Sequence, residues 1–180
     1  MIYDGVNEQV TARVPARAKR VLDLGCGSGA IGRKIKEKIA CKVVGITYCQ
    51  AEAEMASQCL DEVLVCDLNR FELCEVGQFD CIICSHVLEH LYQPDQLLKQ
   101  LHKALLPGGV MVVALPNPLF WRQRLRFLLG HFEYTEGGLM DETHYRFFDW
   151  STAQALLTDS GFAITVKEAH GSFPLSRFLS

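Results

Sequence analysis

Val21-Leu-Asp-Leu-Gly-Cys-Gly-Ser-Gly-Ala-Ile-Gly32 is the stretch that decides the fold of this 180-residue chain. Its first four residues favour a buried β-strand that contains one acidic residue, Asp23. Alternating glycines follow at Gly25, Gly27 and Gly29, and they allow a tight turn and a close approach of the backbone to a ligand. The residues after the last glycine favour a helix, whose first N–H groups would point into the same crevice. The stretch therefore predicts a strand–loop–helix unit that binds a nucleotide-type cofactor.

The composition is that of one globular domain. The chain is 49% hydrophobic and 22% charged, and its length allows a sizeable core but is short for two domains. With a formal net charge of -3 there is no overall positive field to hold nucleic acid or an anionic membrane. Apolar runs stay below the roughly 18 residues that a membrane span needs. We expect a single domain over residues 1–180, with neither a nucleic-acid partner nor a membrane span.

The eight cysteines do not predict a disulfide scaffold. The first twenty residues mix acidic and basic side chains and contain no secretory signal, so a reducing, cytoplasmic location is expected. Cys81 and Cys84 form a C-x-x-C pair inside Phe-Asp-Cys-Ile-Ile-Cys, where strand alternation directs the two thiols to opposite faces. We expect these cysteines, like Cys26, to be packing residues.

Strand-like and helix-like segments alternate along most of the chain. This alternation predicts right-handed crossovers and a Rossmann-like, doubly wound, mostly parallel α/β sheet that is covered on both faces. The expected strands are 20–24, 41–47, 63–66, 80–85, 110–115 and 162–167. The expected helices are 5–13, 30–40, one containing 51–56, 94–106, 119–130 and 151–160, the last of them capped by Ser151.

Residues 119–145 interrupt this rhythm. They begin with an aromatic, arginine-rich stretch around Trp121 and continue as a polar segment that contains Gly137-Gly138. The insertion follows the fifth strand at the carboxyl edge of the sheet, where open α/β sheets bind their ligands. We expect it to be a substrate lid.

The glycine spacing separates two classes of cofactor. A dinucleotide fingerprint would read G-x-G-x-x-G, with an acidic residue about 20 positions later. Here the spacing is Gly25-x-Gly27-x-Gly29, with Asp23 before it. A carboxylate in that place would repel a diphosphate but can orient a cationic amino group or a sugar hydroxyl. A nicotinamide-dependent oxidoreductase is therefore the disfavoured alternative.

A series of motifs in chain order resembles the class I S-adenosylmethionine-dependent methyltransferases over about residues 18–168. The series is Val21-Leu-Asp-Leu-Gly-Cys-Gly-Ser-Gly29, Val43-Val-Gly-Ile46, Val65-Cys-Asp67, Phe79-Asp-Cys-Ile-Ile-Cys-Ser-His-Val-Leu-Glu-His90 and Leu106-Pro-Gly-Gly109. A narrower similarity is to the methionine-biosynthesis W-like branch, methyltransferase type 11 or 12, near cell-surface glycan and natural-product pathways. It is carried by Pro116-Asn-Pro118, Trp121-Arg-Gln-Arg-Leu125 and Asp141-Glu-Thr-His-Tyr-Arg-Phe-Phe148.

The resemblance implies S-adenosylmethionine as the cofactor and a set of residues that hold it. The glycine-loop residues would line the methionine moiety, with Cys26 contributing only its backbone, and Asp67 would accept from the adenine amine. Ser85 and His86 would lie near the sulfonium. The whole implied set is Asp23, Gly25, Cys26, Gly27, Ile46, Thr47, Cys66, Asp67, Leu68, Ser85 and His86.

Thr47 departs from the family pattern, which has an acidic residue there to bind both ribose hydroxyls. One neutral hydroxyl cannot replace a bidentate carboxylate acceptor, so the ribose is held more weakly unless a neighbour such as Tyr48 or Gln50 compensates. On this basis Thr47→Asp is expected to tighten cofactor binding. The departure also leaves open a catalytically inactive, cofactor-binding partner or regulatory protein.

The implied activity is transfer of the methyl group to an O, N or C nucleophile of a small-molecule acceptor, such as a glycan or natural-product precursor. A base is needed only for a hydroxyl acceptor. His144 and His86 are the candidates because imidazole titrates near neutral pH, and a loop-anchoring role is an equal alternative for His144.

His86-Val-Leu-Glu-His90 has the H-x-x-E-H spacing of a zinc peptidase signature. Such a site needs one continuous helix and a third ligand, whereas His86 here leaves a buried strand and Pro94 soon begins another helix. We therefore expect no metal.

The class I fold usually closes with an antiparallel seventh strand beside the sixth. Pro174 interrupts the short stretch after Lys167, so this strand is expected to be incomplete. A bare sheet edge would favour a homodimer.

Overall fold

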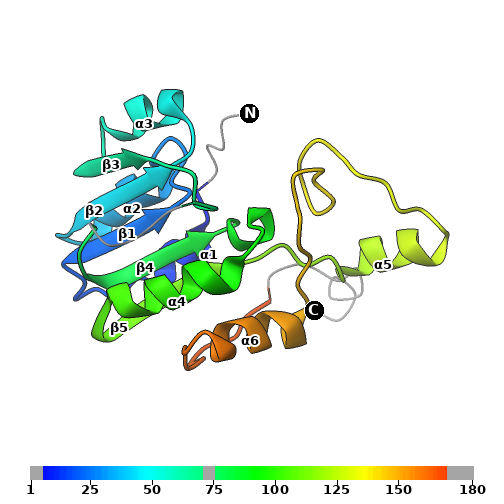
Figure 1. Ribbon diagram of the computed structural model, residues 1–180. Helices are drawn as coiled ribbons and strands as arrows, with labels where there is room; N and C mark the ends of the chain where they lie inside the picture. Colours follow the sequence, from blue (N-terminus) through cyan, green and yellow to red (C-terminus); the bar gives the residue numbers. More distant parts are fainter. Residues whose placement is uncertain (1–5, 71–75, 170–180) are drawn as a thin grey trace, which may run out of the picture.

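The structure, a computed structural model, describes residues 6–70 and 76–169 and has a parallel β-sheet between two layers of helices (Figure 1). The strand order is β3-β2-β1-β4-β5, and every neighbouring pair is parallel. The strands are β1 (Arg20–Leu24), β2 (Lys42–Thr47), β3 (Glu62–Val65), β4 (Phe79–Ser85) and β5 (Leu105–Ala114). The predicted α/β, doubly wound, Rossmann-like fold is confirmed.

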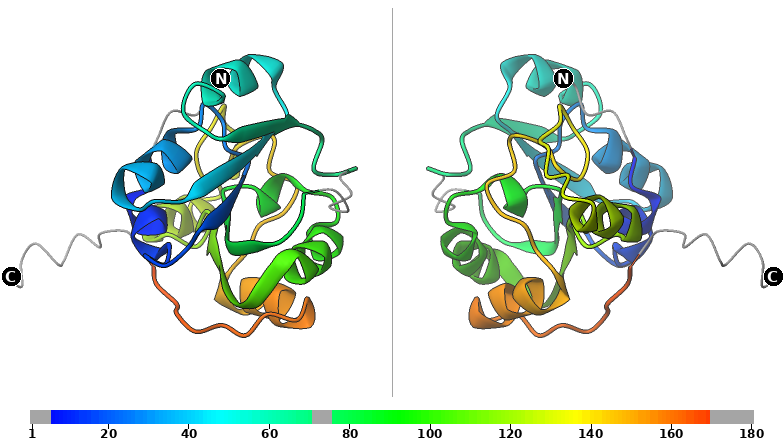
Figure 2. Two further views of the ribbon diagram at one scale, coloured as in Figure 1. Left: turned by 90° about the vertical axis from the view of Figure 1, so that its left-hand side faces the viewer. Right: turned by 90° about the vertical axis from the view of Figure 1, so that its right-hand side faces the viewer.

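Helices cover both faces of the sheet, as the two side views show (Figure 2). One face carries α1 (Glu8–Arg13), α2 (Ala30–Lys38) and α3 (Gln50–Ala56), and the other carries α4 (Pro94–Ala104) and α6 (Trp150–Asp159). The 3-10 turn η2 (Leu88–His90) and the helix α5 (Trp121–Leu128) follow the carboxyl ends of β4 and β5.

Strand alternation produces two separate cores. Val21 and Cys81 pack under α1, α2 and α3, whereas Leu22 and Ile82, one residue further along each strand, pack under α4. Cys84 belongs to the second core, so the two thiols of the C-x-x-C pair lie on opposite faces, as predicted. Burial raises the pKa of Cys81 to about 12 and that of Cys84 further, so both remain neutral packing residues.

The topology determines where a ligand can bind. The chain runs from β1 outward to β2 and β3 and then returns to β4 on the other side of β1. Open α/β sheets bind ligands outside the carboxyl ends of the strands where the direction of winding reverses, and here that place lies between β1 and β4. The glycine loop leaves β1 at this point.

The predicted sixth strand at 162–167 is wrong. After α6 the chain continues without strand structure as far as residue 169. Phe162 packs against the α4 side of the core, with its ring 5.2 Å from that of His102, but the segment joins no ladder. A strand exists only where its N–H and C=O groups find partners, and the described sheet ends at β5. The prediction about a seventh strand falls partly on residues 170–180, which lie outside the described residues.

Two element boundaries differ from the expectations. The cap of α6 is Asp149, which accepts from the Thr152 N–H in a reciprocal capping box, whereas Ser151 only donates to Asp149. β5 begins at Leu105 rather than at 110, because the chain pairs with Phe79 before Pro107-Gly-Gly and the register then shifts. The other boundaries agree to within a few residues. Within the described residues, no helix has the length and apolar character that crossing a membrane requires.

Candidate functional site

The glycine loop has the backbone conformation that the sequence predicted. Gly25, Gly27 and Gly29 have φ angles of 65°, 52° and 84°, a region that side chains disfavour. A Cβ at Gly25 would lie 2.7 Å from Cγ2 of Val87. The Cys26 N–H donates to the Ile46 carbonyl over 2.9 Å, so the loop is tied to β2 through the backbone. Glycine is required here for both conformation and space.

Asp23 is almost completely buried beneath the glycine loop. Its side chain is 1% exposed, and Oδ2 has no hydrogen-bond partner among the described residues. Burial raises its pKa to about 7, although a backbone hydrogen bond from Gly32 in α2 lowers it in part. The contact with Gly32 joins β1 to the first turn of the following helix. The carboxyl group therefore supports the loop from beneath.

A carboxylate that the sequence analysis missed lies beside Thr47. The Thr47 hydroxyl donates to Oε2 of Glu52 over 2.5 Å and accepts from the Cys49 N–H over 3.3 Å. Glu52 is half-buried in the first turn of α3. Its charge, together with that of Asp23, adds to the burial that raises the pKa of Cys26 to about 12. The end of β2 therefore has a carboxylate beside it that comes from the next helix, and an acidic residue in that helix's first turn was the available signal.

Asp67 follows β3 at the same edge of the sheet. Its Oδ1 accepts from the Asn69 N–H over 2.9 Å, which shapes the turn, and its Oδ2 lies 3.8 Å from Nε of Arg70. Cys66 and Leu68 flank it and pack against the core, while the Cys66 N–H donates to the Thr47 carbonyl. The structure thus places the predicted adenine-binding group next to the predicted ribose position.

His86 has an unusual backbone conformation at the end of β4. Its φ angle is 56°, and among the described residues no other residue except glycine has such a left-handed backbone. The His86 N–H donates to the Ala114 carbonyl. Nδ1 of the half-exposed ring lies 3.3 Å from Oε1 of Glu89, which is 0% exposed. The strained turn after Ser85 therefore brings His86 to a buried carboxylate.

His144 reaches the same carboxylate from a distant part of the sequence. Its ring is 8% exposed and meets the ring of His90 edge-on, with centroids 4.7 Å apart. The ligand atoms of Glu89, His90 and His144 lie within 4.8 Å of one another. The two predicted catalytic candidates, His86 and His144, thus converge on Glu89, which the sequence analysis did not select although it belongs to the H-x-x-E-H motif.

The backbone holds this arrangement together. The N–H groups of Tyr145 and Arg146 donate to the Glu89 carbonyl over 2.9 and 3.1 Å. The Arg146 guanidinium also donates to the Tyr92 carbonyl, over 2.7 Å from Nη2. The end of the 119–145 segment is therefore docked at the carboxyl end of β4.

The rest of that segment extends away from the sheet, and Figure 1 shows α5 beyond the carboxyl ends of the strands. Apolar side chains on and after α5 remain exposed to solvent: Leu125, Leu128, Leu129, Phe132 and Tyr134. We refer to residues 119–145 as the arm. Its place at the ligand-binding edge agrees with the predicted lid, and its closure over a ligand stays a prediction.

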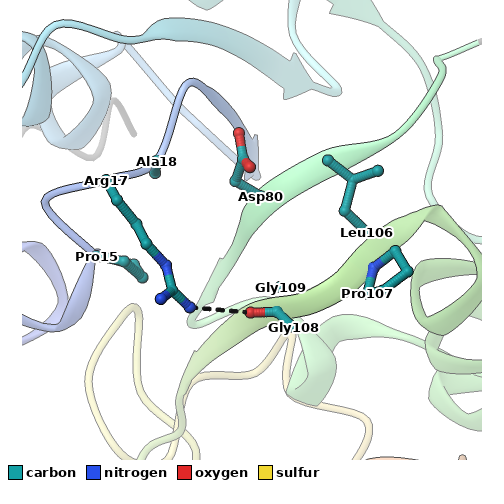
Figure 3. Close-up of a pocket in the computed structure, with 8 residues that line it drawn as sticks. All are labelled: Pro15, Arg17, Ala18, Asp80, Leu106, Pro107, Gly108 and Gly109. Atoms are coloured by element: carbon teal, nitrogen blue, oxygen red, sulfur yellow. Dashed lines mark hydrogen bonds between the residues drawn. The ribbon is translucent and has the colours of Figure 1, made fainter.

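A hollow of about 300 Å³ lies at the opposite edge of the sheet (Figure 3). It is formed by the chain before β1, the start of β4 and the Pro107-Gly-Gly turn, and Arg17 donates to the Gly108 carbonyl across it. Asp80 accepts from the N–H groups of Lys19 and Arg20 there. The hollow is separate from the glycine loop and is not part of the candidate site.

Comparisons with known proteins agree with this geometry. At the level of sequence, 123 residues are 31% identical to the ubiquinone biosynthesis O-methyltransferase of Psychrobacter cryohalolentis, covering 64% of this chain and 48% of that protein. A trans-aconitate 2-methyltransferase of Variovorax paradoxus is 31% identical over 119 residues, covering 61% of this chain and 44% of that protein. The chain spans about half the length of these curated relatives.

The fold is also found in solved structures. An S-adenosylmethionine-dependent methyltransferase from Mesorhizobium loti superposes with a TM-score of 0.67 at 23% identity, covering 88% of this chain and 81% of that one. A family model described as a methyltransferase domain matches residues 4–167. This chain belongs to the methyltransferase-domain family of class I S-adenosylmethionine-dependent methyltransferases.

Proposed function

We propose that this chain binds S-adenosylmethionine around the glycine loop and transfers its methyl group to a hydroxyl of a small-molecule acceptor. The observation that carries the choice of oxygen is the convergence of His86 and His144 on the buried Glu89 at the carboxyl end of β4. An amine with a free electron pair needs no base, whereas a hydroxyl must lose a proton. A carboxylate that lies against imidazoles is suited to that task.

The transfer needs few steps. The acceptor oxygen attacks the methyl carbon, the carbon–sulfur bond breaks, and its electron pair stays on sulfur to give neutral S-adenosylhomocysteine. The hydroxyl proton passes to an imidazole of the cluster, His86 or His144. Orientation of the oxygen and the methyl carbon supplies most of the rate enhancement, up to about 7–11 kcal/mol in favourable cases.

The cofactor residues follow from the arrangement of the edge. Gly25, Cys26 and Gly27 offer backbone groups to the methionine moiety, and Asp67 accepts from adenine. Glu52 accepts from the ribose hydroxyls through Oε1, while Thr47 fixes its other oxygen. A carboxylate in this position supplies the charged acceptor that Thr47 alone lacks.

The names of the relatives also support an oxygen acceptor, since one relative is an O-methyltransferase of ubiquinone biosynthesis. The other methylates trans-aconitate, which is a small carboxylic acid. Both names support a small-molecule acceptor over a macromolecule. A glycan or natural-product precursor and a homodimeric assembly remain more specific proposals from the sequence.

The test is production of S-adenosylhomocysteine from S-adenosylmethionine with a catechol, a tricarboxylate and an aliphatic amine as acceptors. We expect turnover with an oxygen acceptor, and a loss of at least tenfold in kcat for His86→Gln, because a positioned proton acceptor typically supplies about 10²–10⁴-fold. His131→Gln, on the exposed arm, is the matched control and keeps the wild-type rate. Turnover with the amine alone contradicts the choice of oxygen.

The alternative is a protein that binds the cofactor but does not catalyse methyl transfer. Thr47 at the usual position of the ribose acid is the observation that favours an inactive, cofactor-binding partner protein. Tight binding of S-adenosylhomocysteine without turnover on any acceptor class would support this alternative against methyl transfer.

A further inference from the structure

Outside the glycine loop, one side-chain cluster has the composition of a metal site. Glu89 and His90 come from η2, and His144 comes from the arm's end, far along the chain. One ligand atom from each of the three lies within 4.8 Å of the other two. Two imidazoles and one carboxylate at such distances can bind a single ion without a large rearrangement.

The Glu89 carboxylate lacks the partners that a buried charge requires. It is 0% exposed, and within residues 6–70 and 76–169 neither of its oxygens accepts a hydrogen bond. His86 approaches Oε1 to 3.3 Å, which leaves Oε2 without a nearby cation of its own. An unpaired buried carboxylate costs several kcal/mol in folding free energy, on the order of the penalty for desolvating one ion. A bound cation would remove that cost.

In both histidines Nδ1 faces a backbone carbonyl. Nδ1 of His90 lies 3.1 Å from the Thr143 carbonyl, and Nδ1 of His144 lies 3.3 Å from the Leu139 carbonyl. A carbonyl can only accept, so in each neutral ring the proton is on Nδ1 and the lone pair is on Nε2. Histidines that bind metals show this arrangement, since the outer hydrogen bond selects the tautomer and orients the ring.

A second shell of hydrogen bonds holds these histidines in place. The Thr143 hydroxyl and N–H both donate to Oδ1 of Asp141, over 2.6 and 2.8 Å. The Thr143 hydroxyl can therefore only accept from His90, which agrees with the proton on Nδ1. The carbonyl of Glu89 accepts from the Tyr145 and Arg146 N–H groups, so the backbone anchors the arm and leaves the Glu89 side chain available.

We propose that Glu89, His90 and His144 bind one divalent transition-metal ion through a carboxylate oxygen and two Nε2 atoms. The mixed nitrogen and oxygen set suits Zn²⁺, Mn²⁺ or Fe²⁺ better than Mg²⁺, which prefers oxygen ligands. Three protein ligands leave room on the ion for an oxygen of the acceptor. This role rests on the proposed function, whereas the binding of the ion does not.

A bound ion would give the two candidate bases different roles, with His144 as a metal ligand and His86 as the proton acceptor. With His144 as a ligand, the proton of the acceptor hydroxyl passes to His86, whose ring is half exposed beside the cluster. A coordinated hydroxyl loses its proton more readily, because the ion stabilises the oxyanion. The methyl group is then transferred to that oxygen as described above.

The experiment uses full-length protein freed of metal with a chelator and titrated with ZnCl2 and with MnCl2 in a calorimeter. We expect one ion per chain, with affinity reduced at least tenfold in Glu89→Gln, His90→Gln and His144→Gln. His131→Gln is the matched control: His131 and Glu133 lie 4.0 Å apart on the exposed arm and form an ordinary surface pair. It should bind the ion like the wild type.

Two outcomes would overturn the proposal: wild-type protein that binds neither ion, or binding that survives all three substitutions. Should a variant fail to fold, Co²⁺ loaded into the wild type still decides, because a four- or five-coordinate protein site gives visible absorption bands more intense than those of six-coordinate aqueous Co²⁺. S-adenosylhomocysteine binding is measured on the same samples. If it is retained while metal binding is absent, the metal site is wrong and the cofactor binding on which the proposed function depends is unaffected. If metal binds and S-adenosylhomocysteine does not, the metal site stands and the proposed function is wrong.

Discussion

At the residue scale, the most informative position is Thr47. Its buried hydroxyl donates to Glu52, so the residue that departs from the family pattern now positions a carboxylate contributed by the next helix. Because of this contact, we no longer expect an acidic residue at position 47 to tighten cofactor binding. An aspartate there would place two carboxylates in contact, and like charges at that distance disfavour ionisation of both.

We predict that Thr47→Asp weakens S-adenosylhomocysteine binding instead of tightening it. Glu52→Gln should weaken it about tenfold or more, since a hydrogen bond to a charged group contributes about 1.5–3 kcal/mol. Calorimetric titration measures both affinities. Glu54→Gln, the same charge change on the exposed face of α3, is the control and should bind normally. Tighter binding by Thr47→Asp would show that the ribose is held without Glu52.

Asp23 allows a prediction about pH. Its pKa is raised by burial to about 7 in the folded chain, from 3.8 when exposed. The folded state therefore holds this proton more strongly than the unfolded state, and stability is lost as the pH rises toward 7. Asp23→Asn should match the wild type near pH 5 and exceed its free energy of unfolding at pH 8.5, by up to about 3 kcal/mol.

Urea unfolding at pH 5, 7 and 8.5 measures this difference. Asp80→Asn is the control with the opposite sign. The N–H groups of Lys19 and Arg20 hold the pKa of Asp80 below its usual value, so its contribution is present above the unfolded pKa of 3.8 and lost as the pH falls. An Asp23→Asn variant that is equally destabilised at every pH would mean that the carboxyl group is ionised and paired in the folded protein.

At the scale of elements, the strand–loop–helix unit formed by β1, the glycine loop and α2 is the part of the site that depends least on the rest of the chain. Its three left-handed glycines and the tie from Cys26 to β2 define its shape. The unit closes against Val87, beyond the end of β4, so the loop and the acceptor side of the site are in direct contact.

We predict that Gly25→Ala lowers S-adenosylhomocysteine affinity at least tenfold and destabilises the fold. The left-handed backbone alone costs about 1–2 kcal/mol for a side chain, and the clash with Val87 adds to it. Gly108→Ala separates the two effects, because φ there is 75° and a Cβ would meet nothing within 4 Å. It should lose stability but keep the affinity. If Gly25→Ala and Gly108→Ala bound S-adenosylhomocysteine with equal affinity, a close approach of the loop to the ligand would be excluded.

At the scale of the whole molecule, the arm connects the two halves of the site. Its far end donates to the Glu89 carbonyl, and its exposed apolar side chains extend beyond the sheet edge. A lid would bury that apolar surface against the bound ligands and gain about 25 cal/mol for each Å² removed from water. The proposed lid would close from this arrangement and cover the exposed side chains.

We predict that S-adenosylhomocysteine together with an acceptor slows tryptic cleavage of the arm several-fold. Arg122 and Arg124 on α5 are the cleavage sites, since both are exposed. Cleavage at Lys34, on α2 and away from the carboxyl edge, is the internal control and should not change. Arm cleavage at the same rate with and without ligands would refute the lid.

The sequence by itself determined the sheet, the glycine loop and the family. These depend on local patterns: continuous apolar runs in β1 and β4, which are buried on both faces, alternating glycines, and proline at the start of α4. The sixth strand could not be predicted from its own residues, because a strand needs a partner and the alternation at 162–167 carries no information about whether one is present.

Only the tertiary structure decided which groups meet at the site. Glu52 meets Thr47 through a contact between β2 and α3, and His144 reaches Glu89 because the arm folds back onto η2. The sequence analysis rejected a metal at H-x-x-E-H for want of a third ligand, whereas the metal site proposed above takes its third ligand, His144, from the distant arm. Spacing along the chain predicts neighbours on one element, whereas the chemistry of this site depends on side chains that only packing brings within a few ångströms of one another.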